Sequence, residues 1–139
     1  AYIKATGAKI DHGGDSAYYV PLQHRIQLPN YNQFQDAVAY HGTALHELGH
    51  WTKGATDKID RSKLSYGEEE LVAEIFASMT AAKLGIESEV REDHAQYLAS
   101  WLKIIKADKR AIFRAARDAQ KAVDYTDSLQ SSNVTSAAA

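Results

Sequence analysis

The pentapeptide HELGH fills positions 46–50 of this 139-residue chain. A helix turns about 100° per residue, so His46 and His50 lie one turn apart on a single face. Both imidazoles can then reach one metal ion, and Glu47, beside that face, can accept a proton from a water molecule activated there. We therefore expect one catalytic zinc ion (Zn²⁺), with His46 and His50 as ligands and Glu47 as the general base.

The sequence around the motif predicts two helices. Residues 32–53, which contain the motif, are interpreted as one helix, and Gly54 follows its last turn as a C-cap would. The polar residues 55–65 are interpreted as a loop. A second helix is predicted over residues 66–84, which have apolar side chains at helical spacing and Gly85 after their end.

The chain before these helices has strand character over residues 2–28. The β-rich runs 17–20 and 25–28 are joined by a short connection, which predicts a hairpin, and residues 9–11 offer a third strand. We expect a small N-terminal antiparallel sheet or hairpin.

Two further helices are predicted at residues 92–106 and 109–125. Their inward apolar residues are expected to be Leu98, Trp101, Leu102, Ile105, Ile112, Phe113, Ala116 and Val123. Residues 126–139 are rich in Ser, Thr and Ala and are expected to be a disordered tail. The predicted class is α+β, with a sheet followed by about four helices in one domain over residues 1–125.

A catalytic zinc site takes three protein ligands, so the third must come from a separate element. The second helix offers four glutamates. Glu70 and Glu74 share a face with a row of alanines that lets the backbone come close, whereas Glu68 and Glu69 are expected to point elsewhere. Either Glu70 or Glu74 is then the ligand, and the other hydrogen-bonds a ligand histidine from outside the coordination shell.

Composition excludes several classes of protein. The chain has no cysteine, so it has neither disulfides nor thiolate metal sites, which fits a reducing cytosol. No apolar stretch approaches the roughly 20 residues of a membrane span, and the first residues lack the apolar run of a signal peptide. We expect a cytoplasmic protein that has no membrane partner.

The net charge of −2 is too small to indicate a partner, but the charge is unevenly distributed. Residues 103–121 carry seven basic and two acidic side chains. This basic stripe can meet phosphates, although it lacks the interleaved aromatic residues on which single strands stack. A solvated helix face is the simpler interpretation.

The motif and the second helix together resemble the glutamate zincins. The run His46-Glu47-Leu48-Gly49-His50 is followed by Glu70-Leu71-Val72-Ala73-Glu74-Ile75-Phe76-Ala77, which is similar to the ImmA/IrrE-like branch of that group. The resemblance implies a zincin-like metallopeptidase fold in which Glu70 is the third zinc ligand and Glu74 lies in the outer shell.

Several segments carry a longer resemblance, namely residues 14–19, 25–29, 46–52, 69–74, 92–95, 99–103 and 108–113. They resemble the zincin-like C-terminal domain of ArdC-type antirestriction proteins, which are borne by plasmids and phages. This resemblance implies a cytoplasmic location in a bacterial host or recipient cell, and contact with DNA through a separate N-terminal domain. Gly49 stands where many members of that family carry threonine.

Peptide hydrolysis also needs a hydrogen-bond donor for the oxyanion of the tetrahedral intermediate. Tyr66, His94 and Tyr97 are candidates, and His94 and Tyr97 share a face at the start of the third predicted helix. By analogy with zincins, an exposed edge strand at residues 17–20 or 25–28 can hold an extended peptide by backbone pairing.

The sequence supports two functions of different kinds. The first is a zinc-dependent metallopeptidase domain of an antirestriction protein, which hydrolyses a peptide bond of a protein substrate with Glu47 as the base. The alternative is a non-proteolytic antirestriction module that docks a restriction enzyme or DNA on a metal-stabilised fold. The intact Glu47 favours the first, whereas the basic stripe and the implied DNA-binding domain favour the second.

Overall fold

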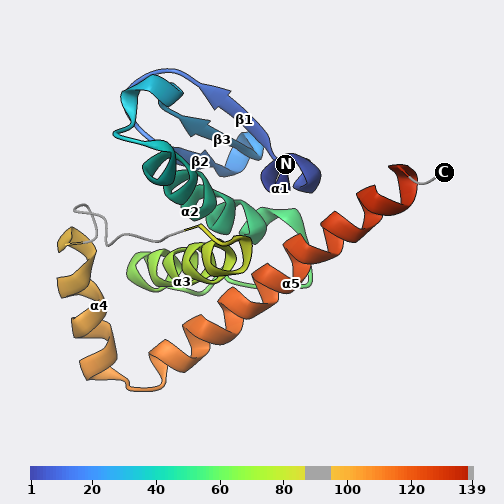
Figure 1. Ribbon diagram of the computed structural model, residues 1–139. Helices are drawn as coiled ribbons and strands as arrows, with labels where there is room; N and C mark the ends of the chain where they lie inside the picture. Colours follow the sequence, from blue (N-terminus) through green and yellow to red (C-terminus); the bar gives the residue numbers. More distant parts are fainter. Residues whose placement is uncertain (87–94, 138–139) are drawn as a thin grey trace.

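Helix α2 (Ala37–Ala55) lies between a small sheet on one side and helix α3 (Tyr66–Leu84) on the other (Figure 1). Helix α5 (Ala111–Ala137) packs on α3, and α4 (Ala95–Ala107) lies beside them. This computed structural model describes residues 1–86 and 95–137, with side chains placed for residues 1–86 and 98–130. The predicted α+β class, a small sheet followed by helices, is confirmed.

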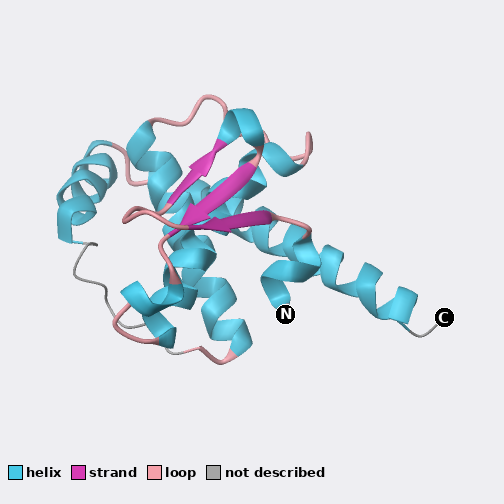
Figure 2. Cartoon of the chain, turned by 90° about the horizontal axis from the view of Figure 1, so that it is seen from above, coloured by secondary structure: helices cyan, strands magenta, loops and turns pink. Residues whose placement is uncertain are grey.

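The sheet contains β1 (Lys9–His12), β2 (Tyr18–Val20) and β3 (Arg25–Leu28) in the order β1-β3-β2 (Figure 2). Strands β2 and β3 pair antiparallel across a short turn, η1 (Pro21–Gln23), so the predicted hairpin is confirmed. Strand β1 pairs parallel to β3, and the sheet is therefore mixed rather than antiparallel.

The strand order decides which strand has a free edge. Strand β3 is central, so the expectation that residues 25–28 could form an edge is wrong, whereas residues 18–20 of β2 do form one. Ile26 and Leu28 on β3 are fully buried and belong to the hydrophobic core. Burial of both side chains makes β3 the strand that anchors the sheet to the helices.

The N-terminus differs from the expectation of strands over residues 2–28, because α1 (Tyr2–Thr6) is a short helix. Gly7 ends it in the left-handed region, at φ 79°. The hydroxyl of Tyr2 lies 2.8 Å from both Thr126 Oγ1 and Asp127 Oδ1 on α5. Helix α1 therefore packs on α5, which lies far from it in the sequence, and no local sequence pattern predicts this contact.

Helix α2 begins at Ala37, later than the expected residue 32. Its N-cap is Asp36, whose carboxylate accepts a hydrogen bond from the backbone N–H of Ala39 at 2.8 Å. The preceding η2 (Tyr31–Gln33) is a separate 3₁₀ turn capped by Asn30. Each cap satisfies backbone N–H groups locally, which favours two elements over one continuous helix.

The same helix runs past Gly54 to Ala55, so the prediction that Gly54 is a C-cap is wrong. A Cβ atom at position 54 would lie 2.5 Å from the hydroxyl oxygen of Tyr19 on β2. A side chain at position 54 would have to displace the Tyr19 hydroxyl, so glycine favours the close approach of α2 and β2. Helix α3, by contrast, has the predicted limits, and Gly85 ends it at φ 71°.

Helix α4 carries its predicted apolar stripe only in part. Trp101 is 8% exposed, but Leu98 and Leu102 are exposed to 48% and 53%. The helix meets α3 near Gly67, where the side chain of Ile104 lies against the glycine. The predicted start of this helix, residues 92–94, lies outside the described part of the chain.

Helix α5 is buried mainly along a row of small residues, and of the larger residues predicted to point inward only Val123 is buried, at 6% exposure. The buried row is Ala111, Ala115, Ala119 and Ala122. Ile112 and Phe113, expected to point inward, are exposed to 40% and 75%. Small side chains let two helix backbones approach closely, so an alanine row is the better surface for packing α5 against α3.

The helix also continues beyond residue 125, where the domain was expected to end. It runs to Ala137, and Thr126 is fully buried. Residues 126–130 are thus part of the packed structure and not a disordered tail. Among the helices that the structure describes, none is long and apolar enough to span a bilayer.

Candidate metal centre

The side chains of His46, His50 and Glu70 converge between α2 and α3. The Nε2 atoms of the two histidines lie 3.2 Å apart. The two oxygens of the Glu70 carboxylate each contact one histidine, with Oε2 lying 3.0 Å from Nε2 of His46 and Oε1 lying 3.0 Å from Nε2 of His50. Donor atoms about 2.0–2.1 Å from a tetrahedral zinc ion lie roughly 3.3 Å from one another. The spacing of these three groups therefore fits a single metal ion.

The two helices approach closely at this point. A Cβ atom on Gly49 would lie 3.0 Å from both Ala73 Cα and Phe76 Cδ1 on α3. Glycine between the two histidines therefore lets the backbone of α3 reach the histidine face of α2. The small side chains of Ala73, Ala77 and Ala81 on α3 act in the same way, since all three are buried.

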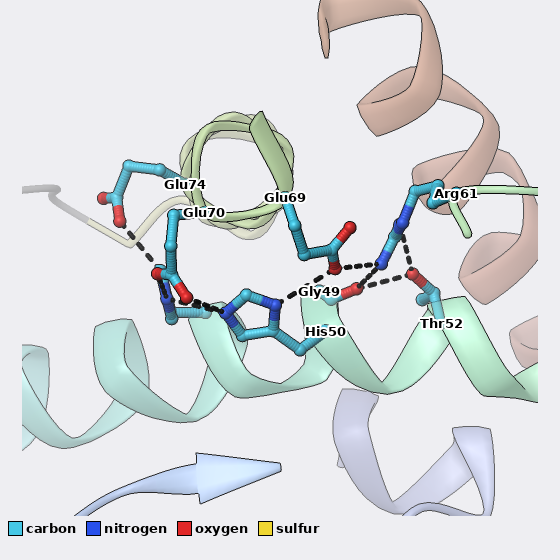
Figure 3. Close-up of polar contacts among 8 residues, drawn as sticks. Gly49, His50, Thr52, Arg61, Glu69, Glu70 and Glu74 are labelled. Atoms are coloured by element: carbon cyan, nitrogen blue, oxygen red, sulfur yellow. Dashed lines mark hydrogen bonds and ion pairs between the residues drawn. The ribbon is translucent and has the colours of Figure 1, made fainter. Parts of the chain in front are cut away.

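Each histidine also has a carboxylate at its second ring nitrogen. Nδ1 of His46 lies 2.8 Å from Glu74 Oε2, where the family resemblance places an outer-shell group. Nδ1 of His50 lies 3.1 Å from Glu69 Oε1 (Figure 3). A hydrogen bond at Nδ1 fixes the tautomer of an imidazole and leaves Nε2 for a metal ion.

The expectation that Glu69 points elsewhere is therefore wrong. Glu69 and Glu70 diverge by about 100° on α3, and His50 lies within reach of both, because its two ring nitrogens face opposite ways. Helix periodicity places Glu70 and Glu74 on one face of the helix and does not show what lies opposite Glu69. Glu69 directly precedes the candidate ligand Glu70 in the sequence. This position was the signal that could have identified Glu69 as a contact of a ligand histidine.

The site has a strong preference for positive charge. Burial opposes the charged form of His46, but its hydrogen bonds with Glu70 and Glu74 outweigh burial and raise its pKa to about 9. Burial likewise favours neutral Glu70, but its hydrogen bonds with His46 and His50 outweigh burial and lower its pKa to about 2. These carboxylates are thus arranged to hold protons on the imidazoles or, in their place, a metal cation.

A cleft of about 540 Å³ opens over the cluster. It is bounded by β2, α2 and α3, and His46, His50 and Glu70 all line it. Glu47 lines the same cleft and is only 7% exposed. The predicted general base therefore lies in the same cavity as the predicted ligands, where it can contact a bound substrate or water.

The three candidate oxyanion donors have different positions. Tyr66, the first residue of α3, lines the cleft and is 72% exposed. His94 and the side chain of Tyr97 lie outside the described part of the structure. Tyr18, within the predicted edge strand at residues 17–20, also lines the cleft, as does Lys53 on α2, which no sequence pattern singled out.

A small sheet packed on a helix that carries HELGH, with a glutamate from the next helix completing the cluster, defines a zincin-like metalloprotein. The chain belongs to the family of zincin-like metallopeptidases called MPTase-PolyVal, whose sequence model matches residues 1–118. Membership of this family implies metal binding.

Two curated relatives have similar sequences over nearly all of this chain. The protein y4eC of Sinorhizobium fredii is 40% identical over 136 residues, which cover 94% of this chain and 44% of y4eC. The DNA primase TraC of Escherichia coli is 40% identical over 139 residues, which cover 95% of this chain and 10% of TraC. The chain thus spans less than half the length of either relative.

Two crystal structures of the antirestriction protein ArdC from plasmid R388 have the same fold. The Mn(II)-bound form matches with a TM-score of 0.81 and 38% identity, over 92% of this chain and 50% of ArdC. The metal-free form matches with a TM-score of 0.83, over 94% of this chain and 49% of ArdC. The resemblance to ArdC-type proteins is therefore confirmed, for about half of their length.

Proposed function

We propose that this chain is a zinc-dependent peptidase domain in which His46, His50 and Glu70 hold the metal ion. One observation carries the proposal: the three donor groups meet at the cleft that Glu47 also lines. A donor set of two imidazoles and one carboxylate suits zinc, although manganese and other divalent ions can replace it.

A bound divalent ion would lower the pKa of a water molecule and polarise the scissile carbonyl. Glu47, which lines the cleft, would accept a proton from the attacking water and return it to the amine that leaves when the peptide bond breaks. Glu69 and Glu74 hold Nδ1 of the two histidines, so that both Nε2 atoms face the ion.

The substrate in this proposal is an extended peptide that lies beside β2. The edge of β2 away from β3 is unpaired in the sheet, and Ala17, Tyr18 and Tyr19 line the cleft. Tyr66 lies one turn before Glu70 on α3, which suits its hydroxyl to stabilise the oxyanion. Tyr97 and His94 stay predictions for the same role.

The biological role that we propose is antirestriction in the bacterial cytoplasm, by cleavage of a protein substrate. ArdC of plasmid R388 is an antirestriction protein and has this fold. Contact with DNA would belong to a separate domain, as the full-length relatives are much longer than this chain.

A non-proteolytic binding module is the second candidate, and one observation favours it. The fold matches metal-free ArdC as closely as the Mn(II)-bound form, with TM-scores of 0.83 and 0.81. An architecture that persists without the metal could dock a restriction enzyme or DNA without chemistry.

The Glu47→Gln variant distinguishes the peptidase from the binding module. For a peptidase, this variant should retain zinc but lose about 10²–10⁴-fold in hydrolysis of a peptide library, together with its antirestriction effect in cells. Glu68→Gln is the matched control, since Glu68 lies on α3 but does not line the cleft. An undiminished antirestriction effect in zinc-loaded Glu47→Gln would favour the binding module.

A further inference from the structure

The loop between α2 and α3 buries an arginine. Arg61 is only 1% exposed and is the largest fully buried side chain in the described part of the chain. A guanidinium is rarely buried unless it is paired, because removing its charge from water is costly. The contacts of Arg61 must therefore compensate for the burial of its charge.

The guanidinium connects the two helices that carry the three candidate metal ligands (Figure 3). Its NH1 group donates to Thr52 Oγ1 at 2.9 Å, and its NH2 group donates to the backbone carbonyl of Gly49 at 2.8 Å, both on α2. The same NH2 group donates to Glu69 Oε1 on α3 at 2.8 Å. Arg61 is thus fixed by α2 and holds a carboxylate of α3.

That carboxylate oxygen is the one that contacts His50. Oε1 of Glu69 lies 2.8 Å from the Arg61 NH2 group and 3.1 Å from Nδ1 of His50. The other oxygen of Glu69 is buried and has no hydrogen-bond partner among the described residues. The orientation of this carboxylate therefore depends on a single oxygen that Arg61 and His50 share.

We propose that Arg61 is a positioning residue that acts through Glu69 on the ring of His50. The buried guanidinium compensates the charge of Glu69 and holds its Oε1 in contact with Nδ1 of His50. The ring then presents Nε2 to the metal ion. The inference rests on the proposed function only in taking His50 as a metal ligand.

This role differs from a purely structural one in a measurable way. If Arg61 only joined the loop to the helices, its loss would lower the stability of the metal-free fold and leave metal binding by folded molecules unchanged. If it positions His50 through Glu69, its loss also weakens metal binding, and this effect becomes smaller when the side chain at position 69 carries no charge.

The experiment is a double-mutant cycle on Arg61→Met and Glu69→Gln, read out with Zn²⁺ and Co²⁺ alone. Zinc affinity is measured by competition with a chromophoric chelator, the Co²⁺ environment by visible absorption, and the metal-free fold by urea unfolding. Glu69→Gln is close in shape to the native residue and is the variant more suited to remain folded. Thr52→Val is the matched control, because it removes one Arg61 contact on α2 without touching Glu69.

We expect each single variant to lose about 10–100-fold in zinc affinity and to alter the Co²⁺ spectrum. The loss from Arg61→Met should be clearly smaller in the Glu69→Gln background than in the wild type, because the guanidinium holds a neutral amide less strongly than a carboxylate. A remaining loss would act through the Gly49 carbonyl, which Arg61 also contacts. Thr52→Val should lower stability while changing zinc affinity less than about 3-fold.

Two results would overturn the inference. One is an unchanged affinity and Co²⁺ spectrum in Glu69→Gln. The other is an equal loss from Arg61→Met in the wild-type and Glu69→Gln backgrounds. Neither measurement uses a peptide, so a wild-type chain that binds zinc but cleaves nothing would refute the proposed function alone.

Discussion

Nδ1 of His46 and Oε2 of Glu74 lie 2.8 Å apart, while Nε2 of the same ring lies 3.0 Å from Oε2 of Glu70. The imidazole is therefore held between two glutamates one turn apart on α3, each at a different ring nitrogen. Because Nε2 also faces His50, this geometry supports the proposal that Glu70 is a metal ligand and that Glu74 orients the ring of His46 from its other nitrogen.

The different positions of Glu70 and Glu74 predict which of the two substitutions weakens zinc binding more. Glu74→Ala should weaken zinc binding by about 10–100-fold, as expected for the loss of a group that orients a ligand. Glu70→Ala removes a ligand and should weaken binding further. Isothermal titration of both variants with zinc tests the order, and the reverse order would show that the two glutamates were assigned the wrong way round.

Substitution of Gly49 tests the close approach of α2 and α3. In a helix, Gly→Ala normally stabilises by about 1 kcal/mol. At position 49 the new Cβ would lie 3.0 Å from Ala73 Cα, a backbone atom that cannot easily move. We expect Gly49→Ala to destabilise the protein by about 1–3 kcal/mol in urea unfolding.

Gly67→Ala is the matched control for that measurement. A Cβ at position 67 would meet only Cδ1 of Ile104, the end of a flexible side chain that can shift. Gly67→Ala should therefore be neutral or stabilising. Equal effects of the two substitutions would argue against a tight contact at Gly49.

The shifted pKa values predict how the stability of the metal-free protein depends on pH. The raised pKa of His46 stabilises the fold fully below about pH 6.5, its unfolded value, and this contribution is lost as pH rises through about 9. The lowered pKa of Glu70 stabilises the fold above about pH 4.3, and this contribution is lost as pH falls through about 2.

In chelator-treated protein, Tm should therefore decline between about pH 6.5 and 9. Zinc should abolish much of that decline, because the cation takes the place of the imidazole protons. His46→Gln, which cannot be protonated, should show a shallower decline without zinc. Parallel pH profiles for the wild type and His46→Gln in chelator would contradict this account.

Truncation tests where the folded domain ends. A chain that ends at Tyr125 loses buried Thr126 and the hydrogen bonds of Tyr2 with Thr126 and Asp127. Its free energy of unfolding should be lower than that of a chain that ends at Gln130. Coincident urea unfolding curves would instead support a domain boundary at residue 125.

The sequence predicted those parts of the molecule that local periodicity controls. The spacing of His46 and His50 on a helix, the limits of α3 and the hairpin of β2 and β3 all depend on residues close together in the chain. Glu70 was left as one of two choices by helix geometry, and the family resemblance favoured it over Glu74.

Tertiary structure decided the features in which distant residues compete for the same place. Helix α5 packs through its alanine row because close approach to α3 outweighs the larger apolar side chains. Glu69 contacts His50 because α2 and α3 pack side by side. Arg61 is buried because the same packing brings the Glu69 carboxylate within hydrogen-bonding distance of its guanidinium. Periodicity along a chain shows which face a residue occupies, but only the packed fold shows what lies opposite that face.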